Sequence, residues 1–404
     1  MISELFVWIW LPHATEPVVC GRLHQEGNQI RFLYGKSYRA RDDAIALAPR
    51  LGLDDGPFLA RREGQLPGPL ADAAPDAWGR RVIEYRVSRA GFGELDYLQM
   101  SAGERIGALH FQDQARVFRK LDVATASLSE LRRAADALER RLPLSPGIAE
   151  ALQHGTSIGG ARPKATLRDG DRALIAKFAS SSDTWSIVRA EWATLALAKR
   201  CGIAVPNAWL EIVDGRDVLL LERFDRAVSA AGQTRRHMLS ALSLLDLDDT
   251  EARLASYLDL AELLRQRARD GAGDAAQLYR RMIFNILVGN TDDHAKNHAC
   301  FWDGRWLTLT PAYDLVPAMR VGEESAQAME VGEQLRASTL ANALSAAGRF
   351  GLNPPAALMI VDEVESTVRT HWQRTFAECG VPEQDIANLR GRAVLSAAAL
   401  RRAE

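Results

Sequence analysis

Short apolar segments separated by turn residues fill roughly the first hundred positions, which indicates a β-rich region. Residues 18–23 and 30–34 flank a polar stretch with a glycine at 24–28, so we predict a β-hairpin there. The apolar run at residues 5–11 is too short to cross a membrane and predicts a buried strand. Residues 106–111 predict the strand that closes this region.

Helical patterns are interspersed with these strands. Residues 43–51 carry a short helical pattern. Another helix is expected to start at residues 75–81, because a proline and an acid stand at its N-terminal end. Ser127 and Glu130 form a capping box, which predicts a helix with its leucines and alanines on one face. Pro143 is expected to end that helix.

Between residues 157 and 226 the pattern becomes strand, helix and strand, with elements expected at residues 173–178, 189–201 and 218–223. Helical spacing then dominates, with helices expected at residues 251–267, 274–289 and 353–380. Asp274 is expected to cap the second of these, and Gly289 to end it. A β-rich part followed by a helical part predicts an α+β fold. A kinase requires this order of parts, and many other α+β proteins have it too.

We divide the chain into a β-rich subdomain at residues 1–112, a mixed part at residues 113–226 and a helical part at residues 227–404. The 404 residues are 47% hydrophobic and 25% charged, which is typical of a soluble globular protein. A net charge of −2 gives no general attraction for nucleic acid, so direct DNA binding is not expected.

The four cysteines stand far apart and form no CxxC pair, which argues against a zinc site and a disulfide framework and fits a reducing cytoplasm. The N-terminal apolar run has no basic region before it and no small-residue cleavage site after it, so we interpret it as a strand and not as a signal peptide. No stretch approaches the roughly 18 to 20 apolar residues that span a bilayer, so no membrane association is expected.

The most specific pattern is a polar loop in which Asp292 and Asn297 stand five positions apart. Asp314 follows a β-run at residues 306–310 and a turn at Pro311. Phosphoryl transfer needs one carboxylate to accept the proton of the attacking hydroxyl, and an amide and a second carboxylate to hold Mg²⁺. The same spacing separates base and metal ligand in the protein-kinase catalytic loop. We therefore predict Asp292 as the catalytic base, and Asn297 and Asp314 as Mg²⁺ ligands.

Two other interpretations of this loop stay open. The acids can be solvated loop residues, with the asparagine capping a helix. A transition-metal site is the other alternative, formed by Asp292, Asp293, His294 and His298. It would require the two histidines to share a helix in a sequence that is typical of a loop.

Residues 155–164 are a candidate phosphate-binding loop. Their small side chains can expose backbone N–H groups to phosphate oxygens, and Arg162 and Lys164 add positive charge. The segment matches neither GxGxxG nor the Walker A pattern. A flexible linker is the alternative interpretation.

Lys177 is flanked by apolar strand residues, so it must extend to solvent or meet an anion. A strand lysine just after a phosphate loop usually holds the α- and β-phosphates of ATP. Glu191, on the following helix, is its candidate partner, although a surface glutamate is an equally good interpretation.

The apolar strand that ends near Glu222 leads into a polar connector at residues 223–226, where a kinase hinge offers backbone groups to adenine. Alternatively, the charged residues of this connector form ion pairs between lobes. The order of phosphate loop, strand lysine, hinge, catalytic loop and metal aspartate predicts an ATP-dependent phosphotransferase. A small-molecule phosphotransferase on a kinase-like fold and a non-catalytic ATP-binding corepressor remain alternatives.

With these motifs in place, the chain resembles the HipA-type Ser/Thr kinase toxins of bacterial toxin–antitoxin modules. The segments that carry the resemblance are residues 157–164, 221–226, 289–297 and 309–314, with residues 75–79 and 107–109 in the N-terminal part. The resemblance implies a divergent two-lobed protein-kinase-like fold with an extra N-terminal β-rich subdomain and a mostly helical C-terminal lobe. It also implies ATP and Mg²⁺ as cofactors.

The resemblance implies roles for further residues and for partners. The ATP-binding residues implied are Ser157, Ile158, Gly159, Gly160, Lys164, Lys177, Glu222, Phe224 and His294. Ser157 is the position that matches the family's autophosphorylated serine. The implied substrate is an aminoacyl-tRNA synthetase, glutamyl-tRNA synthetase above all. The implied partner is a small HipB-like helix-turn-helix antitoxin, through which alone DNA would be contacted.

Overall fold

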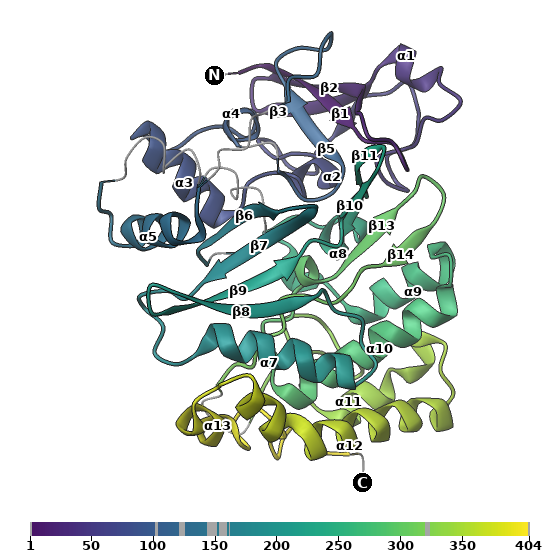
Figure 1. Ribbon diagram of the computed structural model, residues 1–404. Coiled ribbons are helices and arrows are strands. Elements are labelled where there is room, and N and C mark those ends of the chain that lie inside the picture. The colour runs from purple at the N-terminus through teal and green to yellow at the C-terminus, as the bar shows by residue number, and fades with distance from the viewer. Residues whose placement is uncertain are drawn as a thin grey trace. The chain divides into compact units, whose positions relative to one another are not determined.

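The computed structural model describes residues 2–101, 104–120, 126–143, 152, 160, 162–319 and 324–402 (Figure 1). The chain forms two compact units. The first consists of Met1–Ser182, Glu211–Leu239 and Phe301–Arg305, and the second of Asp183–Leu210, Ser240–Cys300 and Trp306–Glu404. Ser157, Ile158 and Gly159, which we predict in the phosphate loop, lie outside the described residues.

A five-stranded antiparallel sheet opens the first unit, in the order β4-β3-β2-β1-β5. Its strands are β1 (Glu4–Ile9), β2 (Val18–Glu26), β3 (Gln29–Tyr34), β4 (Phe58–Leu59) and β5 (Leu109–Gln112). The predicted buried strand, hairpin and closing strand are therefore confirmed, the last beginning at Leu109. Gly27 occupies the hairpin turn with φ +60°, a conformation that favours glycine. The core of this sheet includes Leu5, Ile9, Phe32, Leu98 and Phe111.

The first unit also contains the helices α1 (Lys36–Arg39), α2 (Gly68–Ala71), α3 (Ala77–Val87), α4 (Glu94–Met100) and α5 (Leu128–Glu139). The helix predicted at residues 75–81 is confirmed as α3, where the Asp76 carboxylate accepts a hydrogen bond from the Gly79 N–H at 3.0 Å. The capping box of Ser127 and Glu130 is also confirmed, at the start of α5.

The helix predicted at residues 43–51 is wrong. Two buried tyrosines hold this segment in an irregular conformation instead. The Tyr38 hydroxyl donates to the Ile45 carbonyl at 2.8 Å, and the Tyr34 hydroxyl accepts from the Leu47 N–H and donates to the Leu51 carbonyl, both at 2.7 Å. These side chains satisfy backbone groups that a helix would otherwise pair.

A four-stranded sheet follows, in the order β6-β7-β9-β8. Its strands are β6 (Lys164–Asp169), β7 (Arg172–Phe178), β8 (Ala208–Val213) and β9 (Arg216–Glu222). The predicted strands at residues 173–178 and 218–223 are thus β7 and β9. A hairpin of β10 (Arg226–Ser229) and β11 (Gly232–Arg235) continues the chain. Three short strands form a further sheet in chain order: β12 (Met238–Ser240), β13 (Ala299–Trp302) and β14 (Leu307–Leu309).

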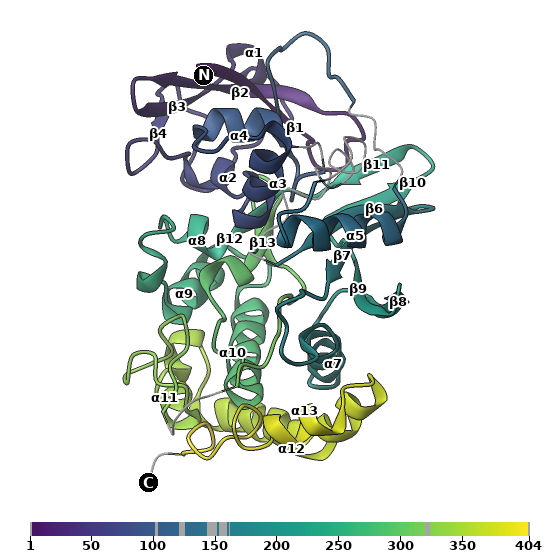
Figure 2. The ribbon, with the colours of Figure 1, turned by 90° about the vertical axis from the view of Figure 1, so that its left-hand side faces the viewer.

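The second unit is mostly helical. Its helices are α7 (Ile187–Arg200), α8 (Ala241–Leu244), η1 (Ala252–Leu254), α9 (Tyr257–Arg267), α10 (Gly271–Val288), η2 (Ala295–Asn297), α11 (Leu340–Ser345), η3 (Ala347–Phe350), α12 (Pro354–Glu378) and α13 (Glu383–Leu389). Helix α10 is buried over most of its length and packs against α9 and α12, and α12 also packs against α7 (Figure 2).

Four predicted helices of this unit are present, with altered boundaries, as α7, α9, α10 and α12. The pattern at residues 251–267 is divided between η1 and α9, because Ser256 caps α9 through hydrogen bonds from the Leu258 and Asp259 N–H groups. Asp274 as the N-cap of α10 is wrong: Asp270 is the N-cap, and the Asp274 carboxylate accepts from the Leu309 N–H at 3.0 Å. Within the described residues, no helix is both long and apolar enough to cross a membrane.

Candidate active site

The loop after α10 begins at a position that only glycine fits. Gly289 has φ +72°, and a Cβ there would lie 2.6 Å from the backbone oxygen of Ala393. Hydrogen bonds from the N–H groups of Gly289 and Asn290 to the last turn of α10 fix the direction in which the chain leaves the helix. The candidate catalytic residues therefore come directly after a helix end whose backbone is fixed.

Asp292 is exposed, and its backbone carbonyl is held from two sides. It accepts hydrogen bonds from the His294 N–H at 2.9 Å and from the Asn297 Nδ2 at 3.2 Å. Asn297 is 7% exposed, and within the described part of the chain no donor binds its Oδ1. The amide group is thus oriented with its nitrogen on the backbone, which leaves its oxygen to accept a donor or a cation.

Asp314 is brought to the same loop by neighbouring contacts. The Thr310 N–H donates to the Ala299 carbonyl at 3.0 Å, and the Tyr313 hydroxyl donates to the Lys296 carbonyl at 2.8 Å. Asp314 has φ +59°, which is uncommon for a residue other than glycine and costs conformational energy. The structure therefore brings the segments that carry Asp292, Asn297 and Asp314 together within one unit.

The transition-metal alternative finds no support at this loop. Among the residues that the structure describes, no three His, Cys, Asp or Glu side chains gather to hold a metal ion. Asp293 and His298 are both buried and hydrogen bonded to each other at 2.8 Å. The donors that remain are hard oxygens, an amide and a carboxylate, which fit Mg²⁺ better than zinc.

Sequence reasoning missed a buried network beneath the loop. The Asp293 carboxylate, 1% exposed, accepts hydrogen bonds from Tyr257 and from Asn285 as well as contacting His298. Burial, the Asp293 charge and their hydrogen bond raise the pKa of Tyr257 well above its ordinary value, so it stays a donor. The doubled aspartate at positions 292 and 293 is the only sequence signal, and it does not say which of the two is buried.

In the first unit, Lys164 and Lys177 stand directly opposite each other on β6 and β7 and therefore share a face of the sheet. Lys164 is 3% exposed, and its Nζ lies 3.9 Å from Asp76 Oδ2. Gly160 has φ +113°, and a Cβ there would lie 2.3 Å from the same Nζ. Like charges at directly opposite positions are destabilising, so this pair of lysines favours an anion nearby, and Asp76 is one such anion beside Lys164.

The predicted hinge lies at the end of β9, where Glu222 and Phe224 are half-buried. The Arg223 N–H continues the ladder to β7 by donating to the Ala173 carbonyl at 2.8 Å. The Phe224 ring meets Phe301 edge to face, with centroids 5.9 Å apart.

The charged residues beside the hinge are buried, and they pair within the first unit. Arg223 and Arg226 both bind the Asp225 carboxylate at 2.8 Å, and that carboxylate also accepts from the Gly107 N–H at 2.8 Å. Burial opposes ionisation of Glu104, but Arg226, Arg223 and other arginines lower its pKa to about 2. The charged residues of this connector therefore form ion pairs, as the alternative expected, but with residues 104–107 of the same unit and not between lobes.

Glu191 is 4% exposed on α7, so its interpretation as a surface glutamate is wrong. It belongs to the second unit and Lys177 to the first, so their pairing stays a prediction.

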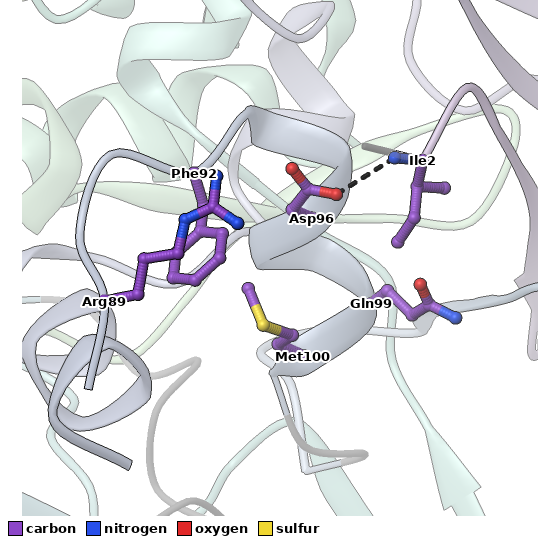
Figure 3. A pocket seen from close by; sticks show the side chains of 6 residues that line it. All are labelled: Ile2, Arg89, Phe92, Asp96, Gln99 and Met100. Atoms are coloured by element: carbon purple, nitrogen blue, oxygen red, sulfur yellow. Dashed lines mark hydrogen bonds between the residues drawn. The ribbon is translucent and has the colours of Figure 1, made fainter. Parts of the chain in front are cut away.

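A separate pocket of about 280 Å³ lies in the first unit and is shown in Figure 3. Two of its polar side chains have contacts: Asp96 accepts from the Ile2 N–H at 3.0 Å, and the Arg89 guanidinium lies 5.2 Å from the centroid of the Phe92 ring. None of the predicted site residues lines it.

The fold and the family of the chain follow from comparisons with known proteins. The solved complex of HipA, HipB and operator DNA from Shewanella oneidensis contains a chain of the same fold, with a TM-score of 0.70, 18% identity and coverage of 95% of this chain and 94% of that chain. The expected α+β, kinase-like fold with an N-terminal β-rich subdomain is confirmed. Family models described as the HipA N-terminal domain and the HipA-like C-terminal domain match residues 14–112 and 156–372. The second match exceeds half of the chain, so the chain belongs to the HipA family.

Two curated relatives have kinase names. Y4mE of Sinorhizobium fredii is named as a kinase on a provisional basis. It is 27% identical to this chain over 347 residues, which are 78% of this chain and 79% of that protein. The serine/threonine-protein kinase toxin HipA of Shewanella oneidensis is 27% identical over 187 residues, 42% of this chain and 43% of that protein.

Proposed function

We propose that this protein is an ATP-dependent serine/threonine kinase that acts as a growth-inhibiting toxin. The observation that carries the proposal is the loop after α10, in which the backbone carbonyl of the exposed Asp292 accepts hydrogen bonds from the His294 N–H and the Asn297 side chain. Family membership and the kinase names of relatives support the same class of activity.

In this proposal Asp292 orients the serine hydroxyl of a protein substrate and accepts its proton. Asn297 and Asp314 would hold Mg²⁺ through their side-chain oxygens, and the Asn297 nitrogen is already hydrogen bonded to the Asp292 carbonyl. When bound, Mg²⁺ supplies positive charge beside the phosphate oxygens. The His294 side chain is half-buried, and its Nδ1 has no hydrogen-bond partner among the described residues, which supports its role as an ATP contact.

The remaining ATP-binding roles belong to the first unit. Lys164 and Lys177, on neighbouring strands, would bind phosphate oxygens of ATP, and Glu222 and Phe224, at the end of β9, would contact its adenine. Ser157, Ile158, Gly159 and Gly160 complete the phosphate loop, and Ser157 is the proposed site of autophosphorylation.

The proposed partners follow from the family. A HipB-like helix-turn-helix antitoxin would neutralise the toxin and carry the DNA contacts, as the composition of the Shewanella complex suggests. The proposed substrate is an aminoacyl-tRNA synthetase, such as glutamyl-tRNA synthetase, in the cytoplasm.

Replacing Asp292 by asparagine tests the proposal. We expect Asp292→Asn to lower kcat for phosphate transfer by about 10²- to 10⁴-fold, because it removes the general base. Folding should be unchanged, since the side chain is exposed. The measurement is transfer of labelled γ-phosphate from Mg·ATP into the proteins of a bacterial lysate, with identification of the labelled protein by mass spectrometry.

Three results would contradict the proposal. If Asp292→Asn transfers phosphate as fast as the wild type, Asp292 is not the catalytic base. Labelling of metabolites alone would favour a small-molecule phosphotransferase. ATP binding without any transfer by the wild type would favour the corepressor.

A further inference from the structure

A carboxylate with no role in the proposed reaction is buried directly beside the catalytic loop. Three buried side chains from separate elements converge on one of its oxygens, Asp293 Oδ2. They are the Tyr257 hydroxyl, the Asn285 Nδ2 at 2.6 Å and the His298 Nε2 at 2.8 Å. Tyr257 begins α9, Asn285 is in the last turns of α10 and His298 immediately precedes β13.

Burying the Asp293 carboxylate costs free energy unless hydrogen bonds within the protein replace those that it would form with water. An apolar side chain of similar size would avoid the cost of removing a charge from water. The three donors compensate part of that cost only if Asp293 keeps a single position. Asn290 fixes the orientation of the Asn285 amide, since its Nδ2 donates a hydrogen bond to Asn285 Oδ1 at 3.1 Å. The network therefore specifies one geometry of this segment.

That geometry determines where Asp292 points. Asp292 and Asp293 are consecutive, and the first is exposed while the second is 1% exposed, so fixing one side chain fixes the peptide that carries the other. The backbone before them is also held, because the Ala328 N–H donates to the Thr291 carbonyl at 3.1 Å. On the other side the Asp292 carbonyl accepts from Asn297. Asp292 is thus the exposed residue in a loop whose neighbours are anchored.

We infer that Asp293 is a positioning residue, which together with Tyr257, Asn285 and His298 holds the Asp292 carboxylate in the orientation that phosphate transfer requires. Asp293 itself does not touch the substrate, because its carboxylate is enclosed by protein. The inference rests on the proposed kinase activity. Misplacement of a catalytic group by about 1 Å can lower a rate by about 10²-fold, so the network acts on the chemical step and not on ATP affinity.

Tyr257→Phe is the most conservative test, because it removes one hydroxyl and keeps the ring. We expect kcat for labelled phosphate transfer to the lysate acceptor to fall by about 10- to 100-fold, with KM for ATP changed by less than about 3-fold. Tyr279→Phe is the matched control. Tyr279 is a fully buried tyrosine of the same unit, and its hydroxyl has no hydrogen-bond partner among the described residues. Its kcat should equal that of the wild type.

Substitutions at Asp293 distinguish positioning from direct catalysis. Asp293→Asn keeps an oxygen acceptor and should retain more activity than Asp293→Ala, whereas Asp292→Asn should be as inactive as Asp292→Ala. Thermal unfolding of each variant confirms that the protein compared is folded.

The outcomes separate the two claims. If the wild type transfers phosphate and Tyr257→Phe does so equally well, the inference is overturned while the kinase activity stands. An equal loss in Tyr279→Phe, or a rise in KM without a fall in kcat, also overturns it. If the wild type transfers no phosphate, the proposed function fails and the inference with it.

Discussion

Two neighbouring aspartates in the loop after α10 have opposite environments. Asp292 faces solvent and keeps its carboxylate available, whereas Asp293 is enclosed by a tyrosine, an asparagine and a histidine. An exposed acid can meet a substrate, and a buried one can only act through its neighbours. The two side chains are chemically identical, so their different burial is what separates the roles that we propose for them.

Gly289 gives a prediction at the same scale. Gly289→Ala should destabilise the protein by more than the roughly 1 kcal/mol expected for placing alanine at positive φ. The added Cβ would also overlap the Ala393 backbone, which cannot move as a flexible side chain can. Thermal unfolding measures the loss. Gly27→Ala is the control, because Gly27 has φ +60° and open space around its Cβ position.

A drop in Tm for Gly289→Ala no larger than that for Gly27→Ala would contradict this prediction, since both positions share the cost of the left-handed backbone.

The spacing of Asp292, Asn297 and Asp314 sufficed to predict that they share a region, because a five-residue interval and a following hairpin limit how far apart they can lie. Their roles as base and ligands stay predictions. The buried network around Asp293 could not be predicted, because Tyr257 reaches it from another helix, 36 residues away in the sequence, and the spacing of Asn285 does not show that its side chain turns toward the loop. Spacing carries no information about such contacts.

At the scale of elements, the pairing of β6 with β7 places Lys164 and Lys177 on one face. We expect Lys177→Met to raise the Kd for Mg·ATP by about 10-fold or more, because one charge-assisted contact to phosphate is lost. The measurement is the rise in Tm on adding Mg·ATP, which depends on binding to the folded state. Arg172→Met, at the other and half-exposed end of β7, is the control and should keep the full rise.

If Mg·ATP raises the Tm of Lys177→Met as much as that of the wild type, this lysine does not bind the phosphates. Loss of the rise in both variants would show instead that any change of charge on β7 disturbs the sheet.

Elements with local signals were predictable. Helices α3, α5 and α12 have capping residues that bind their first N–H groups, and the predictions at all three were confirmed. The segment at residues 43–51 has apolar positions at helical spacing, but two tyrosine hydroxyls from earlier elements bind its backbone. Hydrogen bonds from side chains outside a segment can override its apolar periodicity, and the sequence does not show where those side chains bind.

At the scale of the molecule, the buried charged residues of the first unit make the free energy of unfolding depend on pH in the acidic range. The pKa of Glu104 is about 2 in the folded protein, below its ordinary value of 4.5. Its contribution, roughly 3 kcal/mol, is therefore complete above pH 4.5 and is lost as the pH falls toward 2. We expect the free energy of unfolding of Glu104→Gln to fall less steeply than that of the wild type in this range.

Denaturant unfolding at several pH values measures the slopes. Glu4→Gln is the control, because Glu4 forms an exposed ion pair with Arg22, and such pairs contribute little. Parallel acid slopes for Glu104→Gln and the wild type would contradict the assignment of acid sensitivity to this cluster.

The division of the chain at residues 112 and 226 stays a prediction. Burial of Glu104, Asp225 and their arginines ties the end of the N-terminal subdomain to the segment after β9. Sequence order alone could not reveal this, since about 120 residues separate the partners.

The left-handed backbone at Asp314 has a consequence for how this protein can change over time. Glycine or asparagine would occupy that conformation at lower energy, so selection for heat resistance alone would favour replacing the aspartate. In the proposed role of Asp314 as a Mg²⁺ ligand, the need for phosphate transfer opposes this replacement, so lineages that no longer need the activity should lose the carboxylate early.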